Sequence, residues 1–391
     1  MDAPDPNPHA PPAMPTDGIL VDRELQAALG HWILPAPGAT PPPAAHVQPT
    51  SLDLRLGAVA HRIRAGFTPE RGSFEERLSE LRSDTVSLAD GGAVLDTGAV
   101  YLIPLDEELA LPAGVRARFN PRSSTGRSDI FARVLCPGHS RFDEAPEGYQ
   151  GPLWLEVAPL SFPVRLCRGD RLAQVRLSAG RSALTTEELR EIYSRTPLVF
   201  DGERPLGDDE VLFDEEGGLS LRVGLTGRDP AGWRARRSAP VLSFGKEGAN
   251  EAAEFWEAVP ATEDRAILVP GEFYLLASRE RLRVPPDLAA EMLPVDVGIG
   301  ELRNNYAGFF DAGFGWREGR DGQPQGCGTP AVLEVRAHDV PFLVEDGQVL
   351  FRLRWFRATG RPVRIYGEGR QGRSYADQDL TLARAFRSSD T

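Results

Sequence analysis

The stretch GPLWLEVAPLSFPVRLCRGDRLAQVRL, Gly151–Leu177, has a counterpart later in the chain, GTPAVLEVRAHDVPFLVEDGQVLFRLRW, Gly328–Trp355. Glu156 aligns with Glu334, and each stands between apolar neighbours. Two earlier segments match in the same order: SLDLRLG pairs with LSLRVGL, and GAVYLIPLDEELALPAG pairs with GEFYLLASRERLRVPPD. Because such self-similarity is the signature of an internal repeat, we predict two copies of one domain.

Both copies consist mainly of short segments in which apolar and polar residues alternate, bounded by Gly, Pro and Asp. This pattern is typical of all-β sandwiches and barrels. Helices are few: Val21–Gly30 has apolar residues at helical spacing and ends on glycine, and Thr185–Arg195 carries a capping-box spacing of Thr and Glu. The predicted fold is therefore mainly β, with two tandem β-barrel domains and few short helices.

Composition and repeat pattern divide the chain into four parts. Residues 1–17 are rich in proline and are predicted to be disordered. We assign the first domain to residues 18–200 and the second to residues 201–361. Residues 362–391 form a C-terminal segment rich in Gly, Arg and polar groups, which we expect to be mobile by itself.

The bulk composition narrows the class of partner and the compartment. The chain of 391 residues carries a formal net charge of −13, which argues against a nucleic acid polymer as partner. No apolar run approaches the roughly 18 residues of a membrane span, and the N-terminus does not resemble a secretory signal. Three widely spaced cysteines suggest no disulfide framework, so we expect a reducing cytoplasm and no membrane partner.

The loop NPRSSTGR, residues 120–127, combines two serines, a threonine, a glycine and two arginines. These residue types are common in solvated turns. The same hydroxyls, backbone N–H groups and guanidinium groups are also what a phosphate site requires. A local basic cluster supports the second interpretation, although a solvated basic strand face stays open for its first two members: Arg116, Arg118, Arg122, Arg127 and Arg133.

The segment VLDTGAVYLIPLDEELALPAGVRARFNPRSSTGRSDIF, Val94–Phe131, resembles the core of the dCTP deaminases, which belong to the dUTPase-like superfamily. That family carries an R-S-S-x-x-R loop and a strand reading G-x-I-x-L-E, which GPLWLEV matches here. Further matches are TSLDLRLG to an early strand, GILVDRELQAAL to the N-terminal helix and RGDRLAQVRL to a later strand. The two-copy arrangement is similar to the tandem form of the family, which implies two dUTPase-like distorted β-barrels.

The resemblance implies a role for each residue of the phosphate loop and its strand. Glu156 would be the catalytic base that activates water, and its position among apolar neighbours favours burial. Arg127 would hold Glu156 in its charged form, and Ser123 would position the water. Arg122 and Ser124 would grip the phosphates of the substrate.

Other segments supply the remaining candidate contacts to the substrate. Cys136 stands in the region that resembles the base-contacting hairpin, Asp143 follows it, and Gln174 occupies the glutamine position of the later strand. The segment RIYGEGRQGRSYADQDLTLAR resembles the family's C-terminal lid, which orders over the bound triphosphate. It offers Tyr366 and three candidate contacts to the substrate, Arg373, Tyr375 and Gln378.

The second copy departs from the family pattern. Asp296 stands where the first copy has Ser123, and Gly300 stands where it has Arg127, so we predict that this copy has lost independent triphosphate binding. Its hairpin AGFFDAGFGW, with Asp311, is still similar to the family's. For Glu334 two interpretations stay open: it is a relic, or it serves a site shared between the copies.

A zinc deaminase is the main alternative mechanism. Such enzymes use H-x-E and P-C-x-x-C signatures to let a metal activate water. Cys136 and His139 form a tempting pair, but the chain has no C-x-x-C, so we expect no catalytic metal. Mg²⁺ is expected only as the ion that accompanies the triphosphate of the substrate.

The resemblance implies hydrolytic deamination of dCTP to dUTP and ammonia, a step in pyrimidine deoxynucleotide metabolism. Two alternatives stay open: a dUTP diphosphatase or bifunctional deaminase–diphosphatase, in which Asp143 would orient water, and a non-catalytic nucleotide-binding regulator. In the superfamily, sites form between subunits, so we expect a homo-oligomer. The sequence does not say which copy's hairpin completes the site, and dTTP is a candidate inhibitor.

Overall fold

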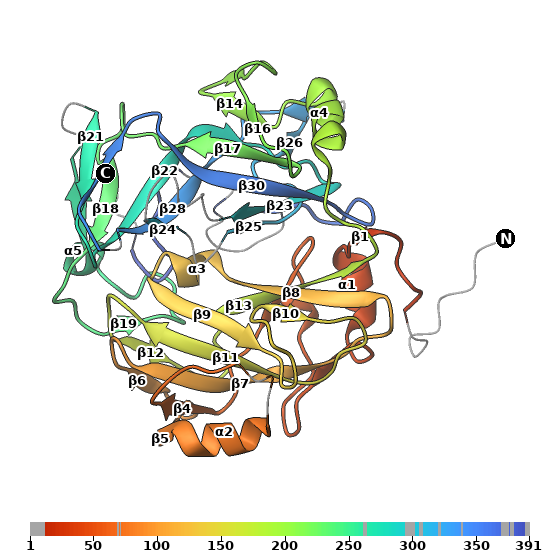
Figure 1. The fold of residues 1–391 in the computed structure, drawn as a ribbon, viewed down its shortest axis with the longest axis vertical. Helices are drawn as coiled ribbons and strands as arrows, with labels where there is room; N and C mark the ends of the chain where they lie inside the picture. The colour runs from red at the N-terminus through yellow and green to blue at the C-terminus, as the bar shows by residue number, and fades with distance from the viewer. Residues whose placement is uncertain are drawn as a thin grey trace.

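The computed structural model describes residues 12–68, 70, 72–260, 264–293, 302–304, 308–319, 322–337, 339–368, 375 and 379–387. Figure 1 shows two β-rich units packed against each other, the first running from red to yellow and the second from green to blue. The predicted mainly β fold of two tandem units with few short helices is confirmed. Of the N-terminal segment predicted to be disordered, residues 1–11 lie outside the described residues.

The strands of the first unit make up three sheets, with the orders β1-β13-β8-β10, β5-β4-β7-β11-β9 and β19-β12-β6. β3 also pairs with β13, and β2 with β7; β19 (Leu242–Ser243) comes from the second half of the chain. Their bounds are β1 (Gly18–Ile19), β2 (Ile33–Pro35), β3 (Leu52–Leu54), β4 (Val59–Ile63), β5 (Arg82–Ser87), β6 (Ala93–Leu95), β7 (Val100–Ala110), β8 (Val115–Pro121), β9 (Ile130–Leu135), β10 (Glu144–Ala145), β11 (Gln150–Pro159), β12 (Val164–Leu166) and β13 (Ala173–Ala179).

The second unit repeats this plan, with the orders β15-β14-β22-β18-β20 and β16-β17-β30-β23-β25; β28 pairs with β22 and β24. Its strands, together with β19, are β14 (Val199–Asp201), β15 (Arg204–Pro205), β16 (Leu212–Phe213), β17 (Gly218–Arg222), β18 (Gly232–Ala235), β19 (Leu242–Ser243), β20 (Trp256–Val259), β21 (Arg265–Leu268), β22 (Phe273–Leu282), β23 (Leu288–Leu293), β24 (Leu302–Asn304), β25 (Phe309–Phe310), β26 (Arg317–Glu318), β27 (Pro324–Gln325), β28 (Thr329–Ala337), β29 (Phe342–Glu345) and β30 (Val349–Arg357).

The helices are short and lie at the margins of the sheets. Both helices predicted from the sequence are confirmed, and in the second the Thr185 side chain caps Glu188 in the expected capping box. No helix in the described part of the chain is long and apolar enough to span a membrane. The helices are α1 (Asp22–Ala28), the 3₁₀ turn η1 (Ala44–His46), α2 (Phe74–Leu81), α3 (Ser123–Gly126), α4 (Thr186–Arg195) and α5 (Ala252–Phe255).

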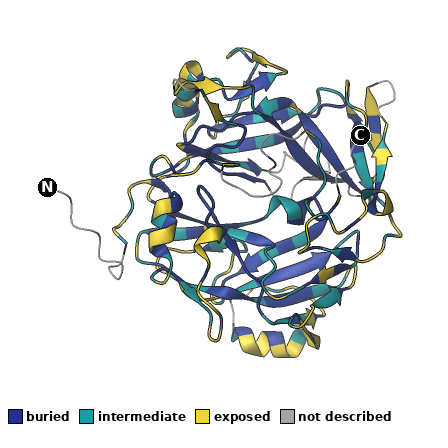
Figure 2. Cartoon of the chain, turned by 180° about the vertical axis from the view of Figure 1, so that it is seen from behind, coloured by how far each residue is buried: buried dark blue, intermediate teal, exposed yellow. Residues whose placement is uncertain are grey.

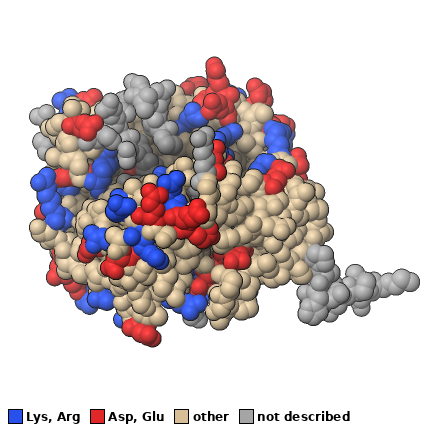
Figure 3. Space-filling view, turned by 60° about the horizontal axis from the view of Figure 1, so that its bottom comes forward, with Lys and Arg blue, Asp and Glu red and all other residues tan. Residues whose placement is uncertain are grey.

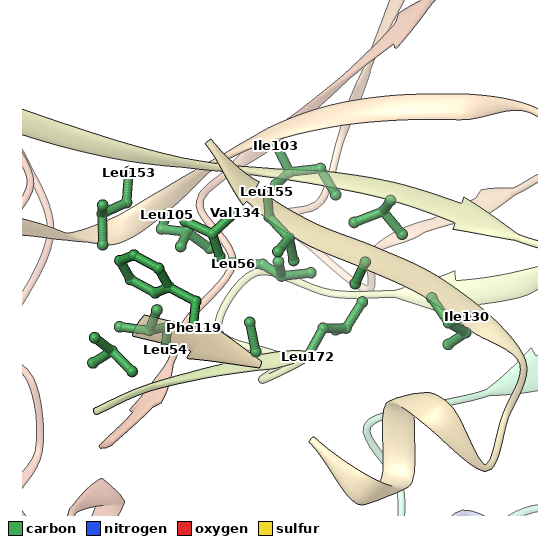
Figure 4. Close-up of a cluster of buried hydrophobic side chains, with 14 of the residues drawn as sticks. Leu54, Leu56, Ile103, Leu105, Phe119, Ile130, Val134, Leu153, Leu155 and Leu172 are labelled. Carbon is green, nitrogen blue, oxygen red and sulfur yellow. The ribbon is translucent and has the colours of Figure 1, made fainter. Parts of the chain in front are cut away.

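Each unit has its own hydrophobic core, formed by the side chains that the strands turn inward. Figure 4 shows Leu56, Leu105, Phe119, Val134 and Leu155 of the first unit pointing toward one another between the strands. Burying one such side chain stabilises the folded state by roughly 1.5–3 kcal/mol. Figure 2 shows that the central strands of both units are largely buried. The alternation in the sequence therefore reflects one inward and one outward face on each strand.

The internal repeat is visible in the side-chain contacts as well as in the strand order. Glu107 of β7 accepts hydrogen bonds from the Arg55 backbone N–H at 2.8 Å and from Arg55 Nε at 2.5 Å. Glu280 of β22 accepts from the Arg222 backbone N–H at 2.8 Å and from Arg222 Nη1 at 2.9 Å. These four residues lie in the segments that the sequence matched, so the predicted repeat extends to a buried ion pair.

The two units exchange short segments near their ends. Helix α4, which lies inside the range assigned from sequence to the first domain, buries Leu189 and Tyr193 in the core of the second unit. The assigned boundary after residue 200 falls within β14, which pairs with β22. Conversely, Phe386 near the C-terminus is buried in the core of the first unit.

Strands β4 and β5 extend the sheet beyond β7, and the segment that joins them, which includes Gly66 and α2 and is called the covering segment, packs on the outer face of β7 and β11. Alternation along β11 places Trp154 and Glu156 on the face opposite the core residue Leu155. The ring of Phe74 packs on Trp154, with centroids 5.0 Å apart. Figure 1 shows α2 on the side of the first unit that is turned away from the second, so the chain itself closes this face.

The corresponding outer face of the second unit, on β22 and β28, receives α3 of the first. Val332 of β28 packs with the core of the first unit, and Arg336 forms an ion pair with Asp129. Asn120 of β8 donates to Glu291 of β23 at 2.9 Å. The equivalent faces of the two units are therefore covered differently, one by a segment of its own unit and the other by the partner unit.

Candidate functional site

A pocket opens between the two units, next to α3. The first unit contributes Gln48, Asp53, Arg122, Ser123, Ser124, Arg127 and Gln174. The second unit contributes Gly308, Phe309, Phe310, Asp311, Phe314, Val332 and Glu334, and the C-terminal segment contributes Tyr366, Tyr375 and Arg384. The phosphate loop predicted from sequence therefore lies at the junction of the copies.

Contacts to Leu172, the residue directly before β13, hold the conformation of the loop. Helix α3 starts directly after Arg122, whose backbone N–H donates to the Leu172 carbonyl at 2.8 Å. The Thr125 hydroxyl donates to the same carbonyl at 2.7 Å and is fully buried. The hydrogen bond from Thr125 therefore fixes the position of the loop. Ser123 and Ser124 both line the pocket.

Arg122 is oriented by an aspartate of the early strand β3. Its Nε lies 2.9 Å from Asp53 Oδ1, and Arg171 Nη1 lies 3.2 Å from Asp53 Oδ2. Asp53 is buried, while the Arg122 side chain retains 17% of its exposure. A guanidinium group has five N–H donors, so one held in this way still has donors to offer an anion.

Arg127 is buried beneath the C-terminal segment. Its Nη1 donates to the Thr381 carbonyl at 2.8 Å, and its guanidinium carbon lies 4.0 Å from the centre of the Tyr375 ring. Burial lowers the pKa of Arg127, while Tyr375 and Glu334 act in the opposite direction. The arginine that the sequence assigned to Glu156 therefore faces the other glutamate of the repeat.

Of the three C-terminal candidates, Tyr375 is the one that the structure places at the pocket. Its hydroxyl lies 2.9 Å from the Ser124 hydroxyl and accepts a hydrogen bond from the Arg384 backbone N–H at 3.0 Å. The other two lid candidates, Arg373 and Gln378, lie outside the described residues. Tyr366 also lines the pocket, and its ring lies 5.6 Å from that of Phe314.

The hairpin that reaches the pocket is that of the second copy. Asp311 accepts hydrogen bonds from the Thr50 backbone N–H at 3.0 Å, the Thr50 hydroxyl at 2.9 Å and the Ser51 hydroxyl at 3.2 Å. The Ser51 hydroxyl also lies 3.3 Å from Gln174 Oε1. These bonds seat the hairpin on the first unit, so Phe310 and its neighbours form an apolar wall opposite the phosphate loop.

Glu334 is a pocket carboxylate of the second unit that lies directly against the phosphate loop, at Gly126. It is 2% exposed, and it is directed outward from β28 toward α3. A Cβ atom built on Gly126 would overlap the Glu334 carboxyl group. Glycine at position 126 is therefore what lets this carboxylate approach the loop.

Glu156 does not join the pocket, which corrects the expected contact with Arg127. It is 3% exposed and its Oε1 pairs with Arg133 Nε at 2.8 Å. A Cβ atom on Gly66 would lie 2.5 Å from Glu156 Oε2, so the covering segment between β4 and β5 closes over this carboxylate. The sequence could not show this, because the two glutamates have nearly the same neighbours and differ in what packs on them.

Asp296 and Gly300, which replace the loop residues in the second copy, lie outside the described residues. Cys136 and Asp143, predicted to contact substrate, do not line the pocket either. Burial raises the pKa of the Cys136 thiol well above its usual range. The Asp143 carboxylate accepts the Val134 backbone N–H at 2.8 Å, a bond that fixes the first copy's hairpin.

Asp143 leads to a prediction about stability. Burial raises its pKa from 3.8 to about 7, so between these values the folded state holds a proton that the unfolded state releases. Stability of the wild type should therefore fall as pH rises through this window, and the benefit of Asp143→Asn should grow and then level off near pH 7. Asparagine tolerates the φ of 59° at this position.

Thermal unfolding from pH 4 to pH 8 checks this expectation. Asp90→Asn is the matched control, because Asp90 has a similar φ of 51° but is exposed. A Tm difference between Asp143→Asn and wild type that does not change with pH would contradict the assignment of the raised pKa.

Several pocket residues escaped the sequence prediction, notably Gln48, Asp53, Phe310 and Arg384. Asp53 had a signal, since it stands inside the TSLDLRLG match and a buried aspartate beside arginines is typical of a binding site. Phe310 and Arg384 stand within the hairpin and C-terminal segments that the resemblance covers, although neither was singled out, whereas Gln48 lies in a proline-rich stretch without a signal. Among the described residues, no group of three or more His, Cys, Asp or Glu could hold a metal ion.

The charged side chains on one outer face can be compared with those of the pocket. Figure 3 shows that acidic and basic side chains are interspersed on the face that it presents. The arginines Arg122, Arg127 and Arg384 gather instead in the pocket between the units. A small anion, in contrast to a long polyanion, is the ligand whose size suits this arrangement.

Two family models match consecutive parts of the chain. The N-terminal domain of 2'-deoxycytidine 5'-triphosphate deaminase matches residues 16–181, and the C-terminal domain of the same family matches residues 185–386. A crystal structure of 2'-deoxycytidine 5'-triphosphate deaminase from Agrobacterium tumefaciens superposes with a TM-score of 0.78 at 40% identity. That match covers 89% of this chain and 99% of the other.

Curated relatives match only part of the chain. A dCTP deaminase of Haloarcula marismortui is 30% identical over 135 residues, 34% of this chain and 66% of its own length. A protein named dCTP deaminase, dUMP-forming, of Methanothermobacter thermautotrophicus is 27% identical over 158 residues, 40% of this chain and 77% of its own length. With one family model for each unit and a structural match across both units, the chain belongs to the dCTP deaminase family, in its tandem two-domain form.

Proposed function

We propose that the pocket between the units hydrolyses dCTP to dUTP and ammonia, with Glu334 of the second copy as the catalytic base. The observation that carries this proposal is the meeting of Glu334 with the serine- and arginine-rich loop of the first copy. The sequence assigned this role to Glu156, which is closed off by the covering segment at Gly66. The interpretation of Glu334 as a contributor to a shared site is thereby favoured over that of a relic.

The chemistry needs one group that can move two protons. Deamination adds water to C4 of the cytosine ring and expels ammonia, so a base must take a proton from water and an acid must protonate the leaving nitrogen. A single buried carboxylate can perform both transfers in sequence. Glu334 would do so, and Ser123 and Arg127 would hold the water and the carboxylate in place.

The phosphate end of the substrate has its own set of residues. Arg122 and Ser124 would contact the triphosphate, with Tyr375 closing over the loop through its bond to Ser124. Mg²⁺ would enter with the triphosphate as part of the substrate, held through phosphate oxygens and waters. Phe310 and Phe314 would form the apolar wall for the nucleoside, and Gln174 supplies an amide near it.

Each chain would then have one working site. The loop of the first copy meets the glutamate of the second, whereas the glutamate of the first is covered by its own chain. The predicted homo-oligomer is not needed to bring these groups together. Calorimetric titration of the Glu334→Gln protein with dCTP should give close to one site per chain, and two equal sites would contradict this arrangement.

Incubation of the purified full-length protein with dCTP and Mg²⁺ tests the function itself. Ammonia and dUTP should form in equal amounts, as measured by a coupled ammonia assay and ion-exchange chromatography. Equal release of ammonia, dUMP and pyrophosphate would instead establish the bifunctional alternative, which the dUMP-forming name of one relative keeps in view. Binding of dCTP or dTTP without turnover would establish a regulator.

The structure favours dUTP as the end product on one specific point. The bifunctional alternative assigned a hydrolytic water to Asp143, but that carboxylate is held by a backbone N–H outside the pocket. The hairpin aspartate inside the pocket, Asp311, is bonded to Thr50 and Ser51. The carboxylate to which the bifunctional alternative assigned the hydrolytic water therefore does not line this pocket.

A further inference from the structure

Asp129 stands two residues after Arg127, where the chain leaves the phosphate loop for β9. Its φ of 52° lies in the left-handed region, which aspartate tolerates better than most residues. Its backbone N–H donates to the Gly126 carbonyl at 2.9 Å, and its carbonyl accepts the Leu160 N–H at 3.0 Å. The backbone therefore holds this residue firmly at the end of the loop.

The Asp129 side chain is fully buried and contacts the second unit. Its Oδ2 accepts the Ser161 hydroxyl at 2.5 Å and forms an ion pair with Arg336 Nη2. Its Oδ1 has no hydrogen-bond partner among the described residues. Burial raises the pKa of Asp129 to about 6, and the Arg336 guanidinium acts against that rise. The ion pair is thus the main interaction that keeps this carboxylate charged.

Arg336 is the second residue after Glu334 on β28, so both side chains leave the same face of the strand. Its other arm, Nη1, donates to the Gly271 carbonyl of the second unit. The guanidinium group therefore connects its own unit to the first unit. The phosphate loop and the residues directly after it meet β28 twice: at Gly126 against Glu334 and at Asp129 against Arg336.

We propose that Asp129 and Arg336 are positioning residues that set the placement of the Glu334 carboxylate against the phosphate loop. The inference rests on the proposed function, because it assigns the pair no role apart from Glu334. Neither residue lines the pocket. They act on turnover by fixing the position of β28 relative to the loop. A displacement of a catalytic group by about 1 Å can lower the rate by up to roughly 100-fold.

Asp129→Asn tests this inference, since asparagine keeps the size and tolerates the φ but removes the charge. We expect kcat for dCTP to fall between about tenfold and about 100-fold, with KM changed less than about threefold, because the phosphate contacts remain. Arg336→Lys keeps the charge but replaces the two-armed guanidinium group with a single ammonium. The kcat of this variant should also fall, but by a smaller factor.

Glu280→Gln is the matched control. Glu280 lies on β22, the strand next to β28, and its buried carboxylate forms an ion pair with Arg222. It does not line the pocket between the units. Its removal disturbs a comparable ion pair without touching the loop, so kcat of the folded variant should stay within about twofold of wild type. Melting curves of all variants show whether each is folded at the assay temperature.

The outcomes separate this inference from the proposed function. The positioning role is overturned if folded Asp129→Asn has the wild-type kcat, or if its kcat/KM falls through KM alone. If the Asn variant does not fold, Arg336→Lys is judged by the same criteria. Equal losses in Glu280→Gln also overturn it, because they would reflect general destabilisation. If Glu334→Gln keeps full turnover, the proposed function fails first.

Discussion

Glu334→Gln should lower kcat for dCTP by at least roughly 100-fold, the usual scale for loss of a general base. Glutamine keeps the shape of the side chain next to Gly126 and can still form hydrogen bonds, so folding and nucleotide binding should persist. What it lacks is a group that can take a proton from water. Steady-state kinetics, together with calorimetric binding of dCTP, measures both quantities.

The matched control is Glu156→Gln, the same change at the repeat-equivalent residue. Because Glu156 pairs with Arg133 under the covering segment and does not line the pocket, turnover should stay within about twofold of wild type. Stability should change, since a buried ion pair loses one partner. A large loss of kcat in Glu156→Gln with little change in Glu334→Gln would reverse the assignment of the two glutamates.

Gly126→Ala should be nearly as damaging to turnover. The added Cβ would overlap the Glu334 carboxyl group, so either the carboxylate or α3 must move. Displacement of a catalytic group by about 1 Å can lower the rate by roughly 100-fold. The protein should also lose about 1–3 kcal/mol of stability, as is typical of overpacking. Kinetics and thermal unfolding of the same preparation separate these two effects.

Gly66→Ala provides the control for the second prediction. A Cβ at Gly66 would lie 2.5 Å from Glu156 Oε2 and 3.1 Å from Arg133 Nη2, so the crowding is against the other glutamate of the repeat. We expect a similar loss of stability with turnover within about twofold of wild type. If both alanine variants lose turnover in proportion to stability, the Gly126 effect is not specific to the site.

Much of this architecture was predictable because it depends on local sequence. Alternating apolar residues and frequent Gly and Pro indicated a mainly β fold, and the matched segments indicated the repeat. The structure confirms both, down to the buried pairs Arg55–Glu107 and Arg222–Glu280. The phosphate loop was also recognisable, since Arg122, Ser123, Ser124 and Arg127 are contiguous and need no distant partner to be identified.

The sequence by itself thus determined the fold class, the duplication and the loop, whereas the tertiary structure decided which glutamate meets that loop. Glu156 and Glu334 occupy equivalent strands with similar neighbours, so local pattern treats them alike. What separates them is packing on the outer face of each strand: the covering segment, with Gly66 and α2, closes over the first, and α3 of the other unit approaches the second. Both contacts join segments far apart in the sequence, and the second also depends on how the two units dock, which no local periodicity encodes.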